Sequence, residues 1–307
     1  MQGFILKRIA IALLTIFIVL TVVFFAFRLG GADPVAIMLP PNATPRNAKV
    51  LTEKFGLDKP LHLQYRGFVE NVVLHGDFGM SFRYSEPALN ILLQRVPATV
   101  QLGLVAFILA LVVGLPIGII SAVKRDSLID RFGRTLALAG MSLPTFWVGV
   151  MLILFLGVTL RWLPIAGRGT PLHYIMPAFC MSLYPIALFT RLSRSAMLDA
   201  LKSEYVLMAR IKGVPEIYVI LLHAFKNASI TVVTVVFGVF GALILGSVVV
   251  ETIFSWPGIG RLVMESFFSR DYPVVQVFVM FVTFVVVTLN LIVDILYAYI
   301  DPRIRYQ

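Results

Sequence analysis

Charged residues are scarce in this chain of 307 residues, at 14% of the total, whereas hydrophobic residues make up 59%. Soluble domains carry roughly a quarter charged residues and about half apolar ones. A water-soluble core of this size cannot hide so many apolar side chains, so the composition predicts an integral membrane protein. The net charge of +10 does not indicate a nucleic-acid surface, because the basic residues lie mostly in short segments between apolar runs.

Cysteine is almost absent too. The single Cys180 lies inside an apolar run, which excludes an intrachain disulfide and a cluster of metal-binding thiolates. The chain has no G-x-x-x-x-G-K-[ST] loop to bind nucleotide phosphates and no G-x-S-x-G nucleophile motif. Histidines are few and too dispersed to suggest a metal site, at His62, His75, His173 and His223.

Six apolar runs are predicted to cross the bilayer, which requires about 20 helical residues. They are Ile9–Phe27, Ala98–Ile120, Thr135–Val158, Tyr174–Thr190, Ile230–Val250 and Val274–Ile300. The fourth is the weakest, because it is short and carries Pro177 and Pro185, which favour kinks. Bulky residues follow the first run where a signal peptidase needs small ones, so we expect an uncleaved first helix.

The basic residues predict the orientation. Short loops after the second and fourth runs, together with both ends of the chain, hold most of them. Cytoplasmic loops of membrane proteins carry an excess of Lys and Arg, so we expect both termini in the cytoplasm. The long segment Arg28–Pro97 then lies outside. Within it, Thr52–Phe55 and Leu61–Leu74 are predicted to be helical, as a small cap on the outer membrane surface.

One predicted cytoplasmic segment, about 191–228, interrupts the apolar sequence with "EYVLMARIKGVPEIYVILLHAFKNA", which begins at Glu204. Gly213 is placed to end a first amphipathic helix in the left-handed conformation, and Pro215 to open a second one. We expect one apolar face on each helix, comprising Leu198, Leu201, Tyr205, Met208 and Ala209 on the first and Ile217, Ile220, Leu221 and Ala224 on the second.

Two interpretations fit this bent pair of helices. It lies flat on anionic lipid, or it docks into a cytoplasmic protein. A lipid-binding face would have a strongly basic rim, whereas Asp199, Glu204 and Glu216 dilute the positive charge here. A glycine bend is also an unusual feature of a helix that lies flat on a membrane. These two points favour a protein partner.

The segment resembles the cytoplasmic coupling segment of bacterial ABC importer permeases, in the form found in the dipeptide/oligopeptide/nickel permease family. The matching positions are Glu204, Tyr205, Val206, Ala209, Arg210, Lys212, Gly213, Val219, His223, Asn227 and Ala228. Further family-like stretches occur in order along nearly the whole chain, including "GLDKPLHLQY", "GDFGMSF", "PATVQL", "SLPTFW", "VVETIFSWPGIGRL", "RDYPVVQ" and "DPRIR".

The resemblance implies a mechanism and a set of partners. Such permeases pair with a second, homologous permease to form the pathway, and each coupling segment docks on one of two ATP-binding cassette subunits. ATP and Mg are used by those partner subunits, so this chain binds no cofactor of its own. An extracytoplasmic solute-binding protein delivers the substrate. The residues implied to couple to the ATPase are Glu204, Tyr205, Ala209, Arg210, Lys212, Gly213, His223 and Asn227.

The chain departs from the broader importer pattern at two positions. Leu207 stands where other importers have a glutamate, and Lys226 where they have a proline. We interpret both as a habit of the peptide-type subfamily. The departure leaves open which side chain makes the polar contact to the ATPase.

Three polar residues in or beside the last two runs are candidates for the pathway or a gate. Glu251 lies at the outer end of the fifth run, and Asn290 and Asp294 share a helical face of the last one. A carboxylate inside a membrane is costly and is therefore a functional hypothesis. A structural role is the alternative for Asp294, and an anchoring role for Glu251.

The sequence therefore predicts an all-α membrane protein with six transmembrane helices and, by resemblance, a type I ABC importer permease core. Residues 1–96 would hold the first helix and the external segment, and 97–307 the permease core. We expect a transport subunit of a bacterial inner membrane, not an enzyme, with short peptides as the substrate. The alternatives are nickel, glutathione or another small solute on the same scaffold, an ion-coupled carrier working alone, or an intramembrane hydrolase.

Overall fold

The computed structural model describes residues 2–29, 35, 45–54, 58–245 and 247–300 of the chain. These residues are mostly helical and form no strand. The chain divides into two compact units, one made of residues 1–97 and 262–307 and the other of residues 98–261.

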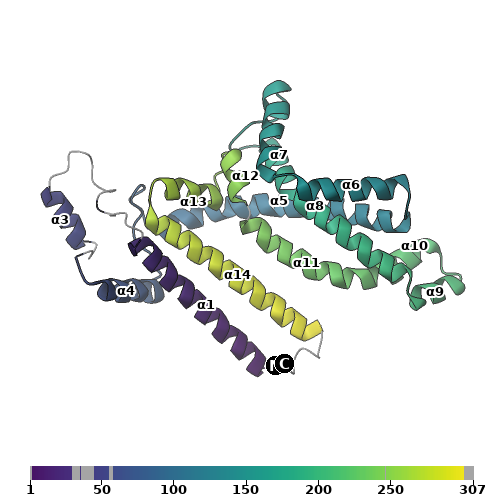
Figure 1. Ribbon diagram of the computed structural model, residues 1–307, viewed down its shortest axis with the longest axis horizontal. Coiled ribbons are helices and arrows are strands. Elements are labelled where there is room, and N and C mark those ends of the chain that lie inside the picture. Colours follow the sequence, from purple (N-terminus) through teal and green to yellow (C-terminus); the bar gives the residue numbers. More distant parts are fainter. Residues whose placement is uncertain (1, 30–34, 36–44, 55–57, 246, 301–307) are drawn as a thin grey trace. The chain divides into compact units, whose positions relative to one another are not determined.

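The first unit is built around two long apolar helices, α1 (Gln2–Leu29) and α14 (Tyr272–Ile300), which pack side by side (Figure 1). The segment predicted to be external contributes α3 (Pro45–Lys54), α4 (Leu61–Glu70) and a π-helical turn η1 (Asn71–His75). Tyr65 of α4 stacks on Phe25 of α1, and its hydroxyl lies 2.7 Å from that of Thr21. The predicted helix at 61–74 is confirmed, and its aromatic face is what holds it against α1.

The second unit contains α5 from residue 98 onward (full helix Ala88–Val123), α6 (Leu128–Ser142), α7 (Thr145–Leu152) with η2 (Ile153–Thr159), α8 (Leu172–Leu201) and α11 (Lys226–Leu245). Both α6 and α11 pack along α8 (Figure 1). Two short helices follow, α12 (Val248–Ile253) and α13 (Ile259–Phe268), of which α13 continues into the first unit. The buried core of this unit is apolar and includes Leu102, Phe189 and Trp256.

Four of the described helices are long and apolar enough to cross a membrane, and a bent pair raises the number to five. The bent pair is the predicted run Thr135–Val158, which the structure breaks by 100° between α6 and α7. Leu143 adopts an extended backbone there, as expected for the residue before Pro144, whose ring disfavours a helical neighbour. The predicted run Ile230–Val250 falls on α11 and α12, partly outside the described residues.

The run predicted to be weakest forms a long continuous helix. Pro177 and Pro185 both lie inside the 30-residue α8, and both are buried. Proline removes one backbone donor from a helix, and neighbouring helices can compensate for that loss inside a packed bundle. The helix continues past the predicted end at Thr190 to Leu201.

Candidate coupling site

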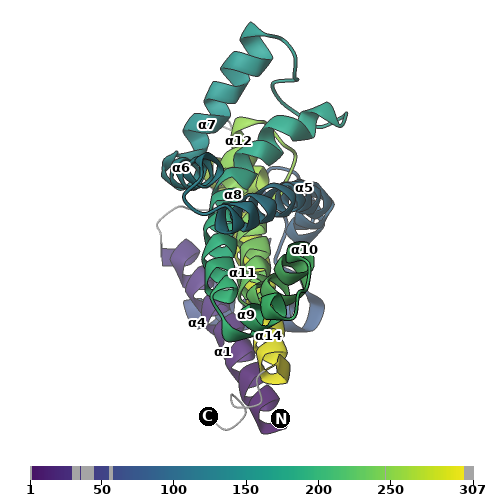
Figure 2. The ribbon, with the colours of Figure 1, turned by 90° about the vertical axis from the view of Figure 1, so that its right-hand side faces the viewer.

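The cytoplasmic segment predicted from the sequence forms an elbow between two long helices. We use "elbow" for residues 202–225, which comprise α9 (Glu204–Ile211), α10 (Glu216–Tyr218) and the π-helical turn η3 (Val219–Phe225). Only Lys202 and Ser203 separate α9 from α8, and η3 runs directly into α11. In Figure 2, α9 and α10 face the viewer, at the ends of α8 and α11. The predicted second amphipathic helix is thus formed by α10 and η3, which continue into α11. A displacement of the elbow therefore acts on both long helices.

Gly213 makes the bend, as the sequence predicted. Its φ is +76°, in the left-handed region that suits glycine. The Gly213 N–H donates to the carbonyl of Arg210, and the Val214 N–H donates to that of Ala209. These two bonds form a Schellman motif, which satisfies the free carbonyls at the end of α9. Pro215 was predicted to be the first residue of the second helix. It is instead the N-cap residue of α10, so the helix begins one residue later, at Glu216.

An ion pair spans the bend. Arg210 donates from Nη2 to Glu216 Oε1 at 2.6 Å and from Nε to Oε2 at 3.1 Å. The Arg210 guanidinium lowers the pKa of Glu216, and that carboxylate in turn raises the pKa of Arg210. The pair is therefore intact above the ordinary glutamate pKa of 4.5 and is lost as the pH falls through the lowered value. Both side chains are largely exposed, so the pair orients the bend more than it stabilises it.

The inner side of the elbow is packed against the helices that carry it. Val206 and Ala209 of α9 and Val219 and Ala224 of η3 are buried. They share a cluster with the last residues of α5 and α8 and the start of α11, at Ala122, Met197, Ala200 and Ala228. This packing holds the elbow to the ends of the long helices.

The outer side of the elbow is apolar as well, and it is open. Its exposed hydrophobic side chains are Tyr205, Leu207, Met208, Ile211, Ile217, Tyr218, Leu221 and Leu222. We call these eight residues the outer face. The sequence placed Tyr205 and Met208 on one apolar face with Ala209, and Ile217 and Leu221 with Ala224. The prediction of one apolar face on each helix is confirmed only in part. Five of the predicted residues pack in one cluster, namely Leu198, Leu201, Ala209, Ile220 and Ala224, whereas Tyr205, Met208, Ile217 and Leu221 are exposed.

The other predicted coupling residues lie on the elbow or where it joins α11. Glu204 and Lys212 are exposed, and His223 is half-buried. Asn227 donates from its side chain to the carbonyl of His223 at 2.9 Å. Asn227 also lines a cavity of about 380 Å³ between the end of α8 and the start of α11, together with Asp199 and Tyr205. The structure thus brings all eight predicted residues into one elbow and its junction with α11.

Glu251, a predicted pathway candidate, is fully buried in α12, just before the turn that leads to α13. Its carboxylate accepts hydrogen bonds from Thr99 Oγ1 at 2.6 Å and from the N–H groups of Gly260 at 2.8 Å and Arg261 at 3.1 Å. Trp256 of the same turn donates from Nε1 to the carbonyl of Ala98. The bonds from Gly260 and Arg261 close the turn 251–261 on itself, and the contacts of Thr99 and Ala98 fasten that turn to α5, which is the geometry of an anchor.

The other two pathway candidates lie on α14. Asn290 is exposed, and the side chain of Asp294 lies outside the described residues. Within the described ranges, no group of three or more His, Cys, Asp or Glu side chains is arranged to hold a metal ion.

One polar cluster of the second unit was not predicted from the sequence. Asp130 at the start of α6 and Arg194 near the end of α8 form a buried ion pair. The available signal was "SLID", in which Asp130 follows Ser127 at the capping spacing. The partner of Asp130, 64 residues away, could not be read from the local sequence.

Comparisons with known proteins identify the family. Residues 114–306 match the family described as binding-protein-dependent transport system inner membrane component, and residues 1–103 match its N-terminal domain family. A protein of Brucella abortus (strain 2308), provisionally named a peptide transport system permease protein, is 38% identical over the full length of both chains. The glutathione transport system permease protein of Salmonella paratyphi A is 39% identical, also over the full length of both.

A solved structure agrees in fold. A chain of the MetNI methionine ABC transporter, in inward-facing conformations, superposes with a TM-score of 0.54 and 18% sequence identity. The match covers 68% of this chain and 98% of that one. The relatives are transport permease subunits and not enzymes, as the sequence predicted. The chain belongs to the family of inner-membrane components of binding-protein-dependent transport systems, the permease subunits of ABC importers.

Proposed function

We propose that this chain is the pathway-forming permease of an ATP-driven importer of short peptides, and that its elbow is the docking site of an ATPase subunit. In this proposal the chain crosses the membrane six times with both termini in the cytoplasm. It pairs with a second, homologous permease, and two ATPase subunits hydrolyse ATP with Mg outside this chain. Residues 1–96 form the first helix and external segment, and 97–307 form the permease core.

The two-sided elbow is the observation that supports this proposal. One apolar side is already used, because it packs on the ends of α5, α8 and α11. The outer face remains as a second apolar surface, bordered by Glu204, Arg210, Lys212 and Glu216. An exposed apolar patch with a charged rim is typical of a protein-binding surface. The mixed charges of this rim fit a protein cleft better than an anionic lipid surface.

The relatives support the choice of substrate. One is named for peptides and another for glutathione, which is itself a tripeptide. A short peptide is the chemical class that both names share. An extracytoplasmic binding protein would select among such peptides before it delivers them. Nickel or another small solute on the same scaffold is the alternative.

The direct test is transport by the reconstituted complex. The chain, its partner permease, the ATPase subunits and the binding protein are placed in vesicles, and uptake of labelled di- and tripeptides, glutathione and Ni²⁺ is measured. We expect uptake of a peptide that requires ATP and both ATPase subunits. Uptake driven by an ion gradient without any ATPase would instead identify a carrier that works alone.

A matched pair of variants tests the elbow itself. Met208→Lys places a charge on the outer face, and Lys202→Met removes a charge at the exposed junction between α8 and α9. A buried unpaired charge at an interface is costly, so M208K should weaken ATPase binding about ten-fold or more while the chain still inserts. K202M should bind as the wild type does. If M208K bound the ATPase as tightly as the wild type does, the outer face would not be the docking surface.

A further inference from the structure

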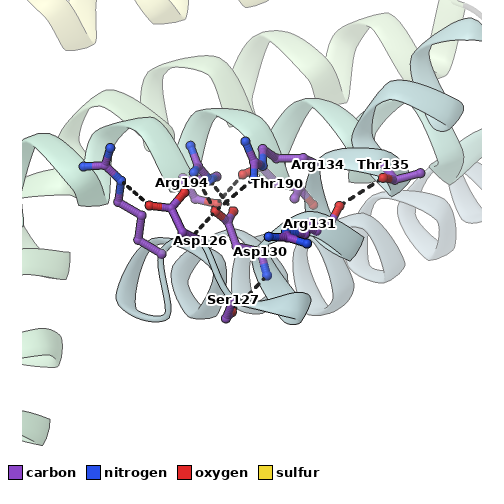
Figure 3. Close-up of polar contacts among 10 residues, drawn as sticks. Asp126, Ser127, Asp130, Arg131, Arg134, Thr135, Thr190 and Arg194 are labelled. Atoms are coloured by element: carbon purple, nitrogen blue, oxygen red, sulfur yellow. Dashed lines mark hydrogen bonds and ion pairs between the residues drawn. The ribbon is translucent and has the colours of Figure 1, made fainter.

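An ion pair between Asp130 and Arg194 joins the first turn of α6 to the last part of α8, outside the elbow. Asp130 has none of its surface exposed. Arg194 donates to it from Nε to Oδ1 at 2.6 Å and from Nη2 to Oδ2 at 2.8 Å, as Figure 3 shows. Arg134 lies at 3.7 Å from the same carboxylate and is half exposed. Arg194 is therefore the principal partner, in a fork geometry that fixes orientation as well as distance.

The same carboxylate holds the turn between α5 and α6. Asp130 Oδ2 also accepts the N–H of Asp126 at 3.0 Å (Figure 3). Asp126 has a φ of +64°, a conformation that non-glycine residues adopt only where surrounding contacts hold them. Ser127 caps α6 by accepting the N–H of Asp130. Asp130 thus connects three parts of the chain, which are the α5–α6 turn, the first turn of α6, and α8.

Small residues bring these helices into close contact around the ion pair. A β-carbon on Gly118 of α5 would collide with the Ser193 side chain and lie 2.5 Å from the Thr190 carbonyl of α8. A β-carbon on Gly133 of α6 would lie 2.5 Å from Ser121 Oγ of α5. Close backbone approach through small residues is how membrane helices pack tightly. The ends of α5, α6 and α8 therefore form one tightly packed joint.

The joint is continuous with the elbow. Arg194 lies one and two turns before Met197 and Ala200 of α8, and both of these residues pack against the inner side of the elbow. Ala122, at the end of α5, belongs to the same apolar cluster. A force applied to the elbow thus reaches the ion pair through the last two turns of α8.

We propose that Arg194 is a positioning residue for coupling, which transmits the displacement of α8 to the α5–α6 turn and to α6 so that the three helices move as one body. This inference rests on the proposed function, because it assumes that an ATPase drives the elbow. Apolar contacts alone would resist separation of α6 and α8 but would allow them to slide. A bidentate pair to a buried carboxylate fixes their register, which is the property that transmission requires.

Two changes at the pair separate transmission from folding. Asp130→Asn with Arg194→Met removes both charges together, so no unpaired charge is buried, and Asn keeps an acceptor for the Asp126 N–H. Arg194→Lys keeps the charge but loses the fork. Arg134→Met is the matched control, because Arg134 faces the same carboxylate at a longer distance from an exposed position.

The measurement is the ratio of peptide imported to ATP hydrolysed by the complete complex in vesicles. For D130N/R194M we expect normal assembly and near-normal ATP hydrolysis, with a ratio that falls roughly three- to thirty-fold. R194K should give an intermediate ratio, and R134M the wild-type ratio. Such a split between hydrolysis and uptake is not expected of a residue that only supports the fold.

Three other outcomes would overturn the inference. A wild-type ratio in D130N/R194M would show that the pair transmits nothing. Uptake and hydrolysis that fall together, in proportion to the amount of assembled complex, would show that it only supports the fold. Absence of ATP-dependent uptake by the wild-type complex would remove the proposed function itself, and this result is obtained before any variant is compared.

Discussion

At the scale of single residues, Gly213 supports the elbow through its backbone and not through packing. Its φ is +76°, and no heavy atom lies within 4 Å of the position that a β-carbon would occupy. A substitution there meets open space, so its cost is conformational, at about 1–2 kcal/mol for an ordinary residue in the left-handed region. That cost falls on the bend between α9 and α10 and leaves the membrane helices alone.

Substitutions at Gly213 should therefore rank by their tolerance of a positive φ. We expect Gly213→Asn to be mildest, Gly213→Ala intermediate and Gly213→Val most severe, with import per ATP falling in that order while insertion is unchanged. The control is Gly67→Val, because Gly67 in α4 has equally open space but a helical backbone. If G213V and G213N coupled equally well, the left-handed bend would not matter for transport.

At the scale of elements, hydropathy and motif spacing predicted where helices lie. They did not predict whether each apolar run forms one unbroken helix. The bend at Gly213 could be predicted, because a glycine directly after an amphipathic helix commonly ends that helix in the left-handed conformation. The break between α6 and α7 also had a local signal, the Leu143–Pro144 pair. Hydropathy could not show it, because an apolar run has the same composition whether it is straight or bent by 100°. Which apolar residues of the elbow are buried depends on the long helices behind them, and periodicity alone cannot show that.

The turn anchored by Glu251 gives a prediction at this scale. Glu251→Gln removes the charge that accepts three hydrogen bonds, so we expect a loss of about 1–3 kcal/mol in the stability of the turn. Replacing Trp147 and Trp162 by Phe leaves Trp256, which is buried in the same turn, as the fluorescent reporter. Its fluorescence during thermal unfolding of the detergent-solubilised protein should show the loss of stability. The control is Glu204→Gln, at an exposed position.

The same pair of variants distinguishes the two roles considered for Glu251. An anchor that is lost should lower thermal stability first, and uptake only as far as the folded fraction falls. Loss of uptake by E251Q without any change in stability would instead place the carboxylate on the transport pathway.

At the scale of the whole molecule, the number of membrane crossings decides whether the elbow is cytoplasmic. Family membership and the alternation of basic segments both support six crossings. Among the described helices, however, the 100° bend leaves α6 with α7 and η2 as either one crossing or a re-entrant segment. If that pair returned to the side from which it started, α8 would carry the elbow to the outside, where no ATPase is present.

Single-cysteine labelling decides between these topologies. Cys180 is the chain's single cysteine and is buried, so Cys180→Ala gives a background free of cysteine. Reporter cysteines replace Lys59 in the segment predicted to be external, Arg125 after α5, Trp162 after η2, and Lys212 in the elbow, all of which are exposed.

In cells with a permeable outer envelope, an impermeant maleimide should label the Lys59→Cys and Trp162→Cys variants. The Arg125→Cys and Lys212→Cys variants should react only after the inner membrane is opened. Labelling of K212C from outside, together with protection of W162C, would mean that α6, α7 and η2 do not cross, and the elbow could not couple to ATP hydrolysis.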